Sequence, residues 1–260
     1  MPEVLKGMVI FNKQVAKNIY LLTLGLGKKV NPKPGQFFML KVSQELNPLL
    51  PRPFSWFEIS DSGREVKFLY QIVGRGTEIL SQKKRGEPIS LLGPLGKGFN
   101  LKPARGKVYL IAGGVGIAGL WALAKKLKED KKLELEIFWG AKNRSYFFLL
   151  PSKSIKPVYA SEDGSKGKKG LVSELFQRRL EGGESPDFFY ACGPRGMLIA
   201  LGLLAKKYSL KGEVLYEERM ACGLGACMGC AVPSSKGGYL RVCQDGPVFN
   251  WEEIDWEKVK

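Results

Sequence analysis

The sequence predicts three modules in order: an antiparallel Greek-key β-barrel, an α/β unit with a parallel sheet, and a small loop-rich module. Three observations lead to this fold class. The first hundred residues contain short β-rich runs separated by turn residues, strands then alternate with helices, and the last fifty residues hold four of the five cysteines. We therefore expect module boundaries at residues 1–100, 101–210 and 211–260.

The first module is expected to form six strands, because Gly, Pro, Asn and Asp separate its apolar runs. Six short strands of this kind favour a small barrel. One helix is expected directly after Gly74 and Gly76, over Thr77–Lys84, with Thr77 as its N-cap. The expected strands are Met8–Phe11, Ile19–Leu24, Gln36–Val42, Phe54–Ser60, Glu65–Val73 and Ile89–Leu92.

The second module begins near Gly106, where the period of the pattern changes. An apolar strand leads into a glycine-rich turn and a helix, and the alternation then continues. Such alternation predicts βαβ units and a parallel sheet. We expect it to stop after Gly212. The expected strands are Val108–Ala112, Leu133–Trp139, Pro157–Ala160 and Asp187–Ala191, and the expected helices are Ile117–Leu127, Leu171–Leu180 and Gly196–Tyr208.

The composition excludes several classes of protein. Of the 260 residues, 44% are hydrophobic and 25% are charged, which is ordinary for a globular protein. The chain has no histidine, which excludes His-ligated haem, Rieske clusters, Ser-His-Asp triads and Cys/His zinc fingers. The sequence contains neither a long uncharged apolar run nor a signal-peptide pattern. We therefore expect a cytoplasmic protein without a membrane segment.

The net charge of +16 by itself suggests an anionic partner. Residues 211–260 carry six basic and eight acidic side chains, so the positive excess lies in the first two modules. The basic residues there form short groups, such as Lys83–Arg85 and Lys166–Lys169, spread along the chain. Because no RNA-binding motif or recognition helix accompanies them, we expect a solvated surface and no nucleic-acid partner.

Four cysteines, Cys222, Cys227, Cys230 and Cys243, follow the order C-x4-C-x2-C-x12-C. This is the plant-type spacing of a [2Fe–2S] cluster. The glycines between the first three would let backbone N–H groups approach the sulfurs. A structural zinc site with four thiolate ligands is the alternative, although zinc ribbons favour paired C-x2-C knuckles. Disulfides are less expected in a cytosolic chain.

The first module also contains residues suited to a dinucleotide. The guanidinium of Arg52 offers two parallel donors to a pyrophosphate, and the hydroxyl of Ser55 could donate to a flavin ring. Gly76 and Thr77 open a helix whose free amides suit a phosphate. Taken singly, a surface arginine and a strand serine would be more ordinary interpretations.

In the second module, Gly113, Gly114 and Gly116 follow a strand and open a helix, as a nucleotide cradle would. Tight strand-to-helix packing would use the same glycines. Cys192 stands at the carboxyl end of another expected strand, where parallel sheets bind ligands. An isolated cysteine can equally be a small buried hydrophobic residue.

Together these motifs resemble the electron-transfer subunit of class 1B dihydroorotate dehydrogenase, a family similar to ferredoxin–NADP reductases with a cluster module appended. The resemblance covers essentially the whole chain. One departure is Gly119, where reductase relatives usually have proline. The matching segments are Arg52-Pro53-Phe54-Ser55, Gly76-Thr77, Gly93-Pro94-Leu95-Gly96, Ala112–Ala118, Glu162–Ser165, Cys192-Gly193-Pro194, Glu218–Cys230 and Arg241–Phe249.

By this resemblance the chain binds FAD on the barrel, a [2Fe–2S] cluster in the last module and, transiently, NAD in the second. Arg52 would bind the FAD pyrophosphate and Ser55 would lie near the ring. Cys192 would lie near the nicotinamide. The implied cofactor-binding residues are Arg52, Pro53, Phe54, Ser55, Leu69, Tyr70, Gln71, Gly76, Thr77, Gly113, Gly114, Gly116, Cys192, Gly193 and Pro194, and the implied metal ligands are Cys222, Cys227, Cys230 and Cys243.

The resemblance also implies a partner, an FMN-containing dihydroorotate dehydrogenase catalytic subunit, in a heterotetramer with two copies of each chain. Electrons would pass from dihydroorotate to the partner's FMN, then through the cluster and FAD to NAD⁺, in pyrimidine biosynthesis. The loop Ala221–Gly229 and the C-terminal segment are expected at this interface. Trp251 and Trp256 would be interface anchors or would fold back onto their own module.

Two other functions remain open at this point. A flavin reductase subunit of a hydrogenase, sulfur reductase or transhydrogenase complex would share the barrel and the sheet. A zinc-stabilised, basic nucleic-acid-binding module belongs to a different class. The choice between NAD and NADP is also open, because Lys142 and Arg144 could favour a 2′-phosphate or simply be solvated.

Overall fold

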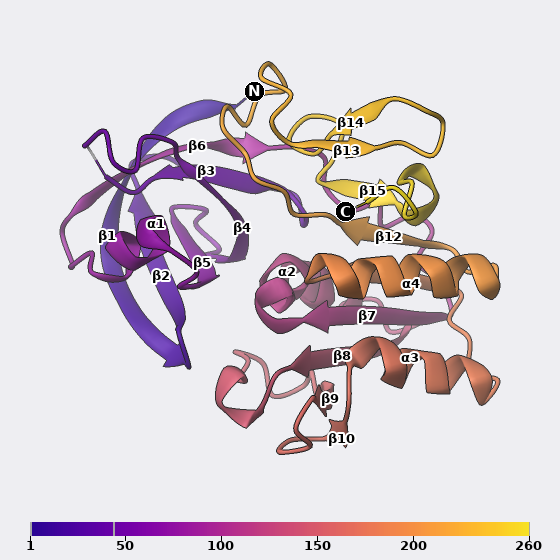
Figure 1. Cartoon of the computed structure of the whole chain (residues 1–260). Helices are drawn as coiled ribbons and strands as arrows, with labels where there is room; N and C mark the ends of the chain where they lie inside the picture. Colours follow the sequence, from indigo (N-terminus) through magenta and orange to yellow (C-terminus); the bar gives the residue numbers. More distant parts are fainter. Residues whose placement is uncertain (1, 44, 260) are drawn as a thin grey trace.

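The computed structural model describes residues 2–43 and 45–259. It confirms the predicted order of an antiparallel barrel, a parallel sheet with helices and a cysteine-rich segment (Figure 1). The longest described helix has 13 residues, and none of the described helices is long and apolar enough to cross a membrane.

Six antiparallel strands close the barrel in the order β1-β2-β5-β4-β3-β6. Inward and outward side chains alternate along them, as in β6, so apolar residues such as Leu22, Phe38 and Phe68 fill the interior. The elements are β1 (Glu3–Ala16), β2 (Ile19–Leu26), β3 (Phe37–Lys41), β4 (Arg52–Ile59), β5 (Glu65–Gln71), α1 (Arg75–Ser81) and β6 (Pro88–Leu95).

The second unit is a seven-stranded sheet in the order β10-β9-β8-β7-β11-β12-β15. Helices α3 and α4 pack on one face and α2 on the other, which explains why β7 and β11 are buried along nearly their whole length. The elements are β7 (Lys107–Gly113), α2 (Ile117–Lys128), β8 (Glu134–Ala141), β9 (Val158–Ser161), β10 (Lys168–Lys169), α3 (Val172–Glu181), β11 (Phe188–Cys192), α4 (Arg195–Lys207), β12 (Gly212–Leu215) and β15 (Val248–Asn250).

The sheet continues past Gly212, where we expected the alternation to stop. Strand β12 pairs in parallel with β11, and β15 then returns from the cysteine-rich segment to pair antiparallel with β12. The sequence pattern missed β12 because the strand has four residues and no helix follows it. Residues 216–247, here called the cysteine segment, therefore connect two neighbouring strands. They include the hairpin β13 (Ala231–Pro233) and β14 (Tyr239–Arg241).

The helix of the barrel begins at Arg75, and the N-cap position is Gly74, so the expectation of Thr77 as N-cap was wrong. The Thr77 hydroxyl oxygen accepts from the amides of Val73 (3.0 Å) and Gly74 (3.3 Å), and the hydroxyl donates to the Gly74 carbonyl (2.9 Å). The threonine side chain reaches backwards over the turn, from the third helical position.

The C-terminal tail folds back onto its own module. Trp251 and Trp256 are 9% and 8% exposed, and their indole nitrogens donate to the carbonyls of Leu210 (2.8 Å) and Trp251 (2.7 Å). The Trp256 ring also covers Gly202 of α4, where an added Cβ would lie 2.7 Å from the indole nitrogen. Of the two alternatives for these tryptophans, the structure supports burial in the core.

Helix α2 joins the barrel to the sheet. The Trp121 indole stacks on Phe57 of β4 at 5.8 Å, and its nitrogen donates to the Glu58 carboxylate at 3.1 Å. Lys67 and Lys125 also bind that carboxylate. These contacts set how the two units face each other, and so they fix the walls of the cleft between them.

Candidate functional site

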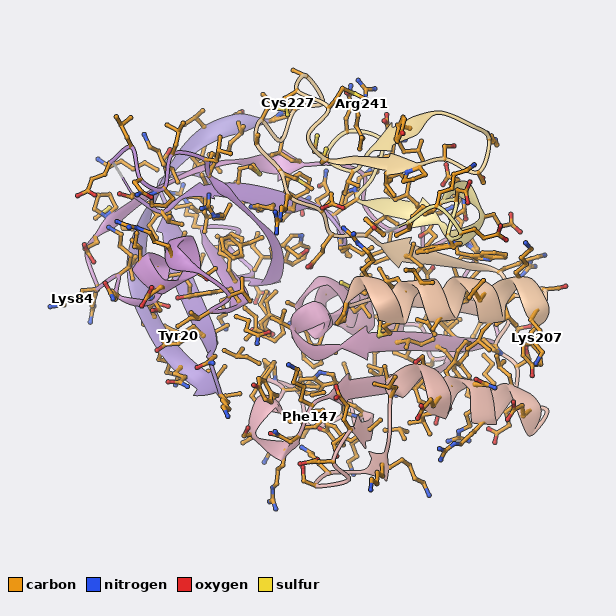
Figure 2. All side chains as sticks on the ribbon, viewed as in Figure 1. Tyr20, Lys84, Phe147, Lys207, Cys227 and Arg241 are labelled. Carbon is orange, nitrogen blue, oxygen red and sulfur yellow. The ribbon has the colours of Figure 1, made fainter. Side chains whose placement is uncertain are left out.

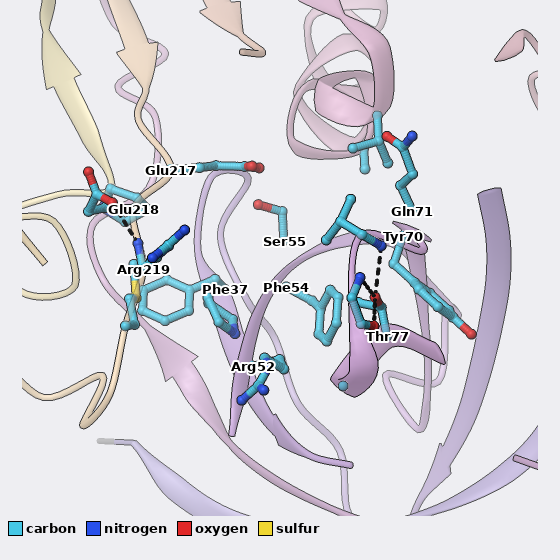
Figure 3. Close-up of a pocket in the computed structure, with 18 of the residues that line it drawn as sticks. Phe37, Arg52, Phe54, Ser55, Tyr70, Gln71, Thr77, Glu217, Glu218 and Arg219 are labelled. Carbon is cyan, nitrogen blue, oxygen red and sulfur yellow. Dashed lines mark hydrogen bonds between the residues drawn. The ribbon is translucent and has the colours of Figure 1, made fainter. Parts of the chain in front are cut away.

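A cleft of about 750 Å³ opens between the barrel, the start of α2 and the beginning of the cysteine segment (Figure 3). A cavity of this volume accommodates a large cofactor. Strands β4 and β5 form one wall, and residues 215–220 contribute to another. The barrel residues that the sequence suggested for flavin binding all line this cleft: Arg52, Pro53, Phe54, Ser55, Leu69, Tyr70, Gln71, Gly76 and Thr77.

One part of the cleft suits a pyrophosphate. A Cβ at residue 76 would lie 2.7 Å from Nε of Arg52, so the guanidinium rests directly on the Gly76 backbone. Nη1 of Arg52 donates to the Leu50 carbonyl at 2.5 Å, which restrains the side chain. A restrained guanidinium beside a glycine turn can donate two hydrogen bonds to a phosphate group.

The barrel wall of the cleft is aromatic. The Tyr70 ring stacks on Tyr20 and meets Phe54 edge-on, with centroid distances of 5.7 Å in both cases. Burial raises the pKa of Tyr70, whose hydroxyl donates to Asn12 at 3.0 Å, so the phenol is neutral. Flat, uncharged surfaces of this kind suit the ring systems of a dinucleotide.

The barrel and the sheet meet at Gly119, in the first turn of α2. A Cβ there would lie 3.2 Å from the Cys192 sulfur, 3.6 Å from the Ser55 hydroxyl oxygen and 2.9 Å from the Leu215 side chain. The absence of a side chain therefore lets a barrel hydroxyl, the thiol at the end of β11 and a β12 side chain come together at the cleft. Proline at this position would not leave the same gap.

Glu217 lines this end of the cleft, whereas Cys192 lies buried behind it and does not line it. Cys192 is fully buried, and burial, together with the nearby Glu217 carboxylate, raises the pKa of its thiol well above the ordinary value. The Glu217 side chain projects into the cleft, where Figure 3 shows it at the same end as Ser55. Glu217 itself is exposed in this cleft. Because of its raised pKa, the Cys192 thiol is protonated at neutral pH and unsuited to nucleophilic attack.

The glycine turn after β7 packs directly against the loop after β11. An added Cβ at Gly116 would lie 2.3 Å from the Cys192 carbonyl oxygen, and one at Gly113 would lie 2.6 Å from Pro194. An added Cβ at Gly193 would lie 2.9 Å from the Gly113 backbone. Gly114 differs, because it has a φ of +54° and open space where a Cβ would stand. Packing thus explains three of these glycines, and the positive φ explains Gly114, which faces open space.

Each of the four segment cysteines accepts a backbone N–H. The donors are Leu224 to Cys222 (3.4 Å), Gly229 to Cys227 (3.5 Å), Cys243 to Cys230 (3.4 Å) and Gly225 to Cys243 (3.1 Å). Such bonds stabilise negative charge on sulfur. The hydrogen bond from Leu224 leads those that lower the pKa of Cys222 to about 6, whereas burial raises that of Cys243 to about 12.

The sulfurs are arranged as two pairs. The Cys227 side chain lowers the pKa of Cys222, and the Cys230 side chain raises the pKa of Cys243 more than Cys222 does. Throughout residues 2–43 and 45–259, no three side chains of the metal-ligating types converge on one point. Two irons with two cysteine ligands each would require this paired arrangement, so the residues present fit an iron–sulfur cluster. One pair includes the exposed Cys227, and the other pair is buried.

The cysteine segment packs against the barrel next to the cleft. A Cβ at Gly223 would lie 2.8 Å from the Met39 side chain of β3, while Phe37, two residues earlier on β3, lines the cleft. Residues 217–220 line the cleft and run directly into Cys222. The two candidate cofactor sites are therefore adjacent.

Comparison with known proteins identifies both parts. Residues 217–255 match the iron–sulfur cluster binding domain of dihydroorotate dehydrogenase B, and residues 110–201 match the oxidoreductase NAD-binding domain. The dihydroorotate dehydrogenase B (NAD⁺) electron transfer subunit of Caldanaerobacter subterraneus subsp. tengcongensis is 40% identical over 254 residues, which cover 96% of this chain and 98% of the relative. The chain belongs to the family of dihydroorotate dehydrogenase B electron transfer subunits.

Other relatives agree with this assignment. The subunit of the same name from Geobacillus sp. is 39% identical over 95% of this chain and 96% of its own length. A solved structure described as an NADH-dependent reduced ferredoxin–NADP oxidoreductase superposes with a TM-score of 0.85 at 26% identity, over 97% of this chain and 91% of the other. The ferredoxin reductase of carbazole 1,9a-dioxygenase, at 19% identity and a TM-score of 0.70, covers 80% of this chain and 67% of its own and shares the fold.

Within this electron transfer subunit family, the cysteines lie in the matched iron–sulfur domain, and the glycine turn and Cys192 lie in the matched NAD-binding domain. Sequence reasoning did not assign Phe37, Glu217 or Arg219 to the cleft, although all three line it. Glu217 directly precedes the matching family segment that begins at Glu218. It also follows the buried Tyr216, which comes directly after β12, and this position becomes informative only once β12 is placed in the sheet.

Proposed function

We propose that this chain passes electrons from a dihydroorotate-oxidising, FMN-containing catalytic subunit to NAD⁺, with FAD in the cleft and a [2Fe–2S] cluster on Cys222, Cys227, Cys230 and Cys243. The observation that carries the proposal is the continuity of the two sites, because residues 217–220 line the cleft and lead into the first cysteine. Such a cluster transfers single electrons and a flavin holds one or two, so together they can connect a one-electron donor to a hydride acceptor.

The chain's own residues would bind and orient these groups. Arg52 would hold the FAD pyrophosphate, and Ser55 would place its hydroxyl beside the ring. Cys192 would pack next to the nicotinamide as a neutral thiol, consistent with its burial and raised pKa. Gly114 would admit the NAD phosphates close to the backbone, because it faces open space.

The exposed side of the cysteine segment supports a protein partner. Cys227 is exposed, and the neighbouring Leu224 and Met228 expose 53% and 49% of their surface. An apolar rim around an exposed ligand cysteine is what a docking subunit would cover. We propose two copies of each subunit in the complex, as the family resemblance implies, and a cytoplasmic location, where thiols remain reduced.

Copurification with the catalytic subunit, followed by flavin, iron and sulfide analysis, tests this function. The complex should contain FMN, FAD, iron and sulfide, and should reduce NAD⁺ with dihydroorotate. The chain alone should reduce artificial acceptors with NADH and remain inert toward dihydroorotate. A complex that contains zinc in place of iron, or that does not couple dihydroorotate to NAD⁺, would contradict the proposal.

A second candidate is a reductase subunit of a transhydrogenase-type complex. It is favoured by the superposition, at a TM-score of 0.85, on the solved NADH-dependent reduced ferredoxin–NADP oxidoreductase. The higher identity to dihydroorotate dehydrogenase B subunits, at 40%, favours the first candidate. Reduction of ferredoxin or NADP⁺ by this chain with a different partner, without dihydroorotate oxidation, would support the second.

A further inference from the structure

Arg241 forms a connection between two parts of the cysteine segment that are far apart in the sequence. Its side chain binds the Asp245 carboxylate through Nε (3.1 Å) and Nη2 (3.3 Å), and its remaining nitrogen, Nη1, donates to the Gly225 carbonyl at 3.3 Å. The Arg241 backbone N–H also donates to Asp245, at 2.8 Å. Figure 2 shows Arg241 at the same edge of the molecule as Cys227.

Gly225 needs an external restraint. It has a φ of +82°, and a Cβ would lie 1.8 Å from the Gln244 side chain, so glycine alone fits. A glycine backbone rotates more freely than that of any other residue, and its own conformational preference does not fix the direction of its amide. Yet this amide makes the shortest of the four N–H···S contacts, 3.1 Å to the Cys243 sulfur.

The two peptide groups that flank the Gly225 α-carbon are therefore both held by residues 241–245. The carbonyl accepts from Arg241, and the amide donates to Cys243. Asp245 restrains the guanidinium with two hydrogen bonds, and its own N–H closes the 241–245 turn by donating to the Arg241 carbonyl at 2.7 Å. If the guanidinium were lost, the Gly225 carbonyl would be free to rotate and the amide could leave the sulfur.

We infer that Arg241, restrained by Asp245, is a positioning residue that aims the Gly225 N–H at the Cys243 sulfur and thereby sets the reduction potential of the cluster. This inference rests on the proposed function, because it requires the cluster. Hydrogen bonds to the sulfurs stabilise the more negative, reduced form and raise the potential. Outer contacts of this kind also typically change metal retention by tenfold or more.

The experiment compares the purified complex with its Arg241→Lys and Arg241→Gln variants by redox titration and electron paramagnetic resonance of the cluster. Lysine keeps the positive charge, but a single ammonium cannot reproduce the planar contacts to both Asp245 and Gly225. Both variants should shift the potential downward, alter the resonance of the reduced cluster, and lose iron to a chelator about tenfold faster.

Two control variants separate positioning from charge. Lys97→Gln removes an exposed positive charge that also acts on Asp245. Among the contacts described for Lys97, no side-chain contact reaches Gly225. Arg179→Gln removes a half-buried arginine that binds two carboxylates, those of Glu136 and Glu184, on the α3 side of the sheet. Neither change should move the potential or the resonance.

The outcomes decide the inference. A wild-type potential and resonance in Arg241→Lys would overturn it, as would an equal shift in Lys97→Gln, since charge alone would then explain the effect. The Arg241 variants could retain too little cluster to titrate. In that case, iron loss from Arg241→Lys with flavin retained supports the positioning role. Iron loss from Arg241→Gln alone overturns the inference. An Asp245→Asn variant should show a smaller shift of the same sign. Absence of a [2Fe–2S] spectrum in the unmodified complex would instead refute the proposed function.

Discussion

In the cleft, the side chains that would face a cofactor stand on β4 and β5, whose backbone is fixed by pairing within a closed barrel. Around the cysteines the backbone has little regular structure, and several of its amides donate to sulfur. The orientation of an amide that donates to a cysteine sulfur depends on the group that the sulfur binds. We therefore expect the cleft to keep its shape without a cofactor, whereas the cysteine segment should be ordered by the group it holds.

Within the cysteine segment, the part around Cys230 and Cys243 joins the core differently from the part around Cys222 and Cys227. Cys230 and Cys243 share one hydrophobic cluster with α4, Trp251 and Trp256, whereas Cys227 is exposed. The part around Cys230 and Cys243, here called the inner half, is thus supported by the tail and the sheet. The part around Cys222 and Cys227 packs on the barrel at Gly223 and faces the side where we propose the partner.

The largest expected effect separates the two sites. Replacing Cys243 by Ala should abolish stoichiometric iron and inorganic sulfide, because the cluster would lose a buried ligand, while flavin content should remain, since no cysteine of the segment lines the cleft. Colorimetric iron and sulfide assays with flavin absorbance measure both. The same result is expected for Cys222, Cys227 and Cys230. Full retention of iron and sulfide would contradict the ligand assignment.

Next in size is the support of the inner half by the tail. Trp256→Ala should lower the free energy of unfolding by about 3–5 kcal/mol, because it empties a buried site against Gly202 and Tyr216. Denaturant unfolding followed by tryptophan fluorescence and circular dichroism tests this, with Trp256→Phe as a milder control. Unchanged stability in the alanine variant would indicate that the tail lies outside the core and would reopen its role as an interface anchor.

A smaller effect is expected at the phosphate end of the cleft. Arg52→Ala should weaken FAD binding about ten- to hundredfold, since a partly buried pyrophosphate would lose a charge-assisted contact of roughly 1.5–3 kcal/mol. Iron and sulfide should be unaffected. Flavin release measured by fluorescence gives the affinity. A variant that binds FAD as tightly as the parent would show that the guanidinium does not contact the pyrophosphate.

Much of this architecture could be predicted from the sequence because its signals are local. Turn residues separated the barrel strands, and the spacing of four cysteines indicated the cluster. The ends of elements were less accessible. Strand β1 runs for 14 residues and is interrupted by two irregularities in register. Because many of its outward side chains are polar, the apolar pattern predicted a much shorter strand. Strand β12 has four residues and no following helix, so nothing in the local pattern marked it.

The end of the cleft around Ser55 and Gly119, here called the ring end, was predicted only through the family resemblance, which implied Ser55 near the flavin ring and Cys192 near the nicotinamide. Local patterns could not give its geometry, because that geometry is produced by tertiary contacts. Ser55, Gly119, Cys192 and Leu215 come from four elements, and only the packing of α2 between the barrel and the sheet brings them together. Gly119 looked like a departure from the family pattern, yet its missing side chain is what makes room for the other three. Thr77 shows the reverse case, since a residue typical of an N-cap occupies a different position in the turn.

The ring end should respond less than the phosphate end. Cys192→Ala should retain iron, sulfide and flavin, because Cys192 belongs neither to the sulfur pairs nor to the walls around Arg52. It should slow flavin reduction by NADH by about tenfold or less, since it loosens the packing at Gly119 without removing a phosphate contact. Stopped-flow reduction measures this rate. Loss of iron in this variant would mean that the ligands have been assigned wrongly.

The smallest expected effect concerns Glu213, at the junction where the cysteine segment leaves the sheet. Its side chain on β12 is buried and accepts from the Asn100 amide, in the connection between barrel and sheet, at 3.0 Å. Burial raises its pKa from 4.5 to about 7. Because the folded chain holds this proton more tightly than the unfolded chain, its stabilising contribution is complete below about pH 4.5 and is lost as the pH rises through 7.

Glu213→Gln tests this contribution directly, because glutamine keeps an oxygen to accept from Asn100 but cannot ionise. Between pH 5 and pH 8 the parent chain should lose on the order of 1 kcal/mol of unfolding free energy, the size expected for a carboxylate that is partly hydrated in the folded state. The variant should not show this loss. Denaturant midpoints at the two pH values measure the difference. An identical pH dependence in both proteins would show that the carboxylate ionises freely in the folded state, and that the junction between the sheet and the cysteine segment is open to water.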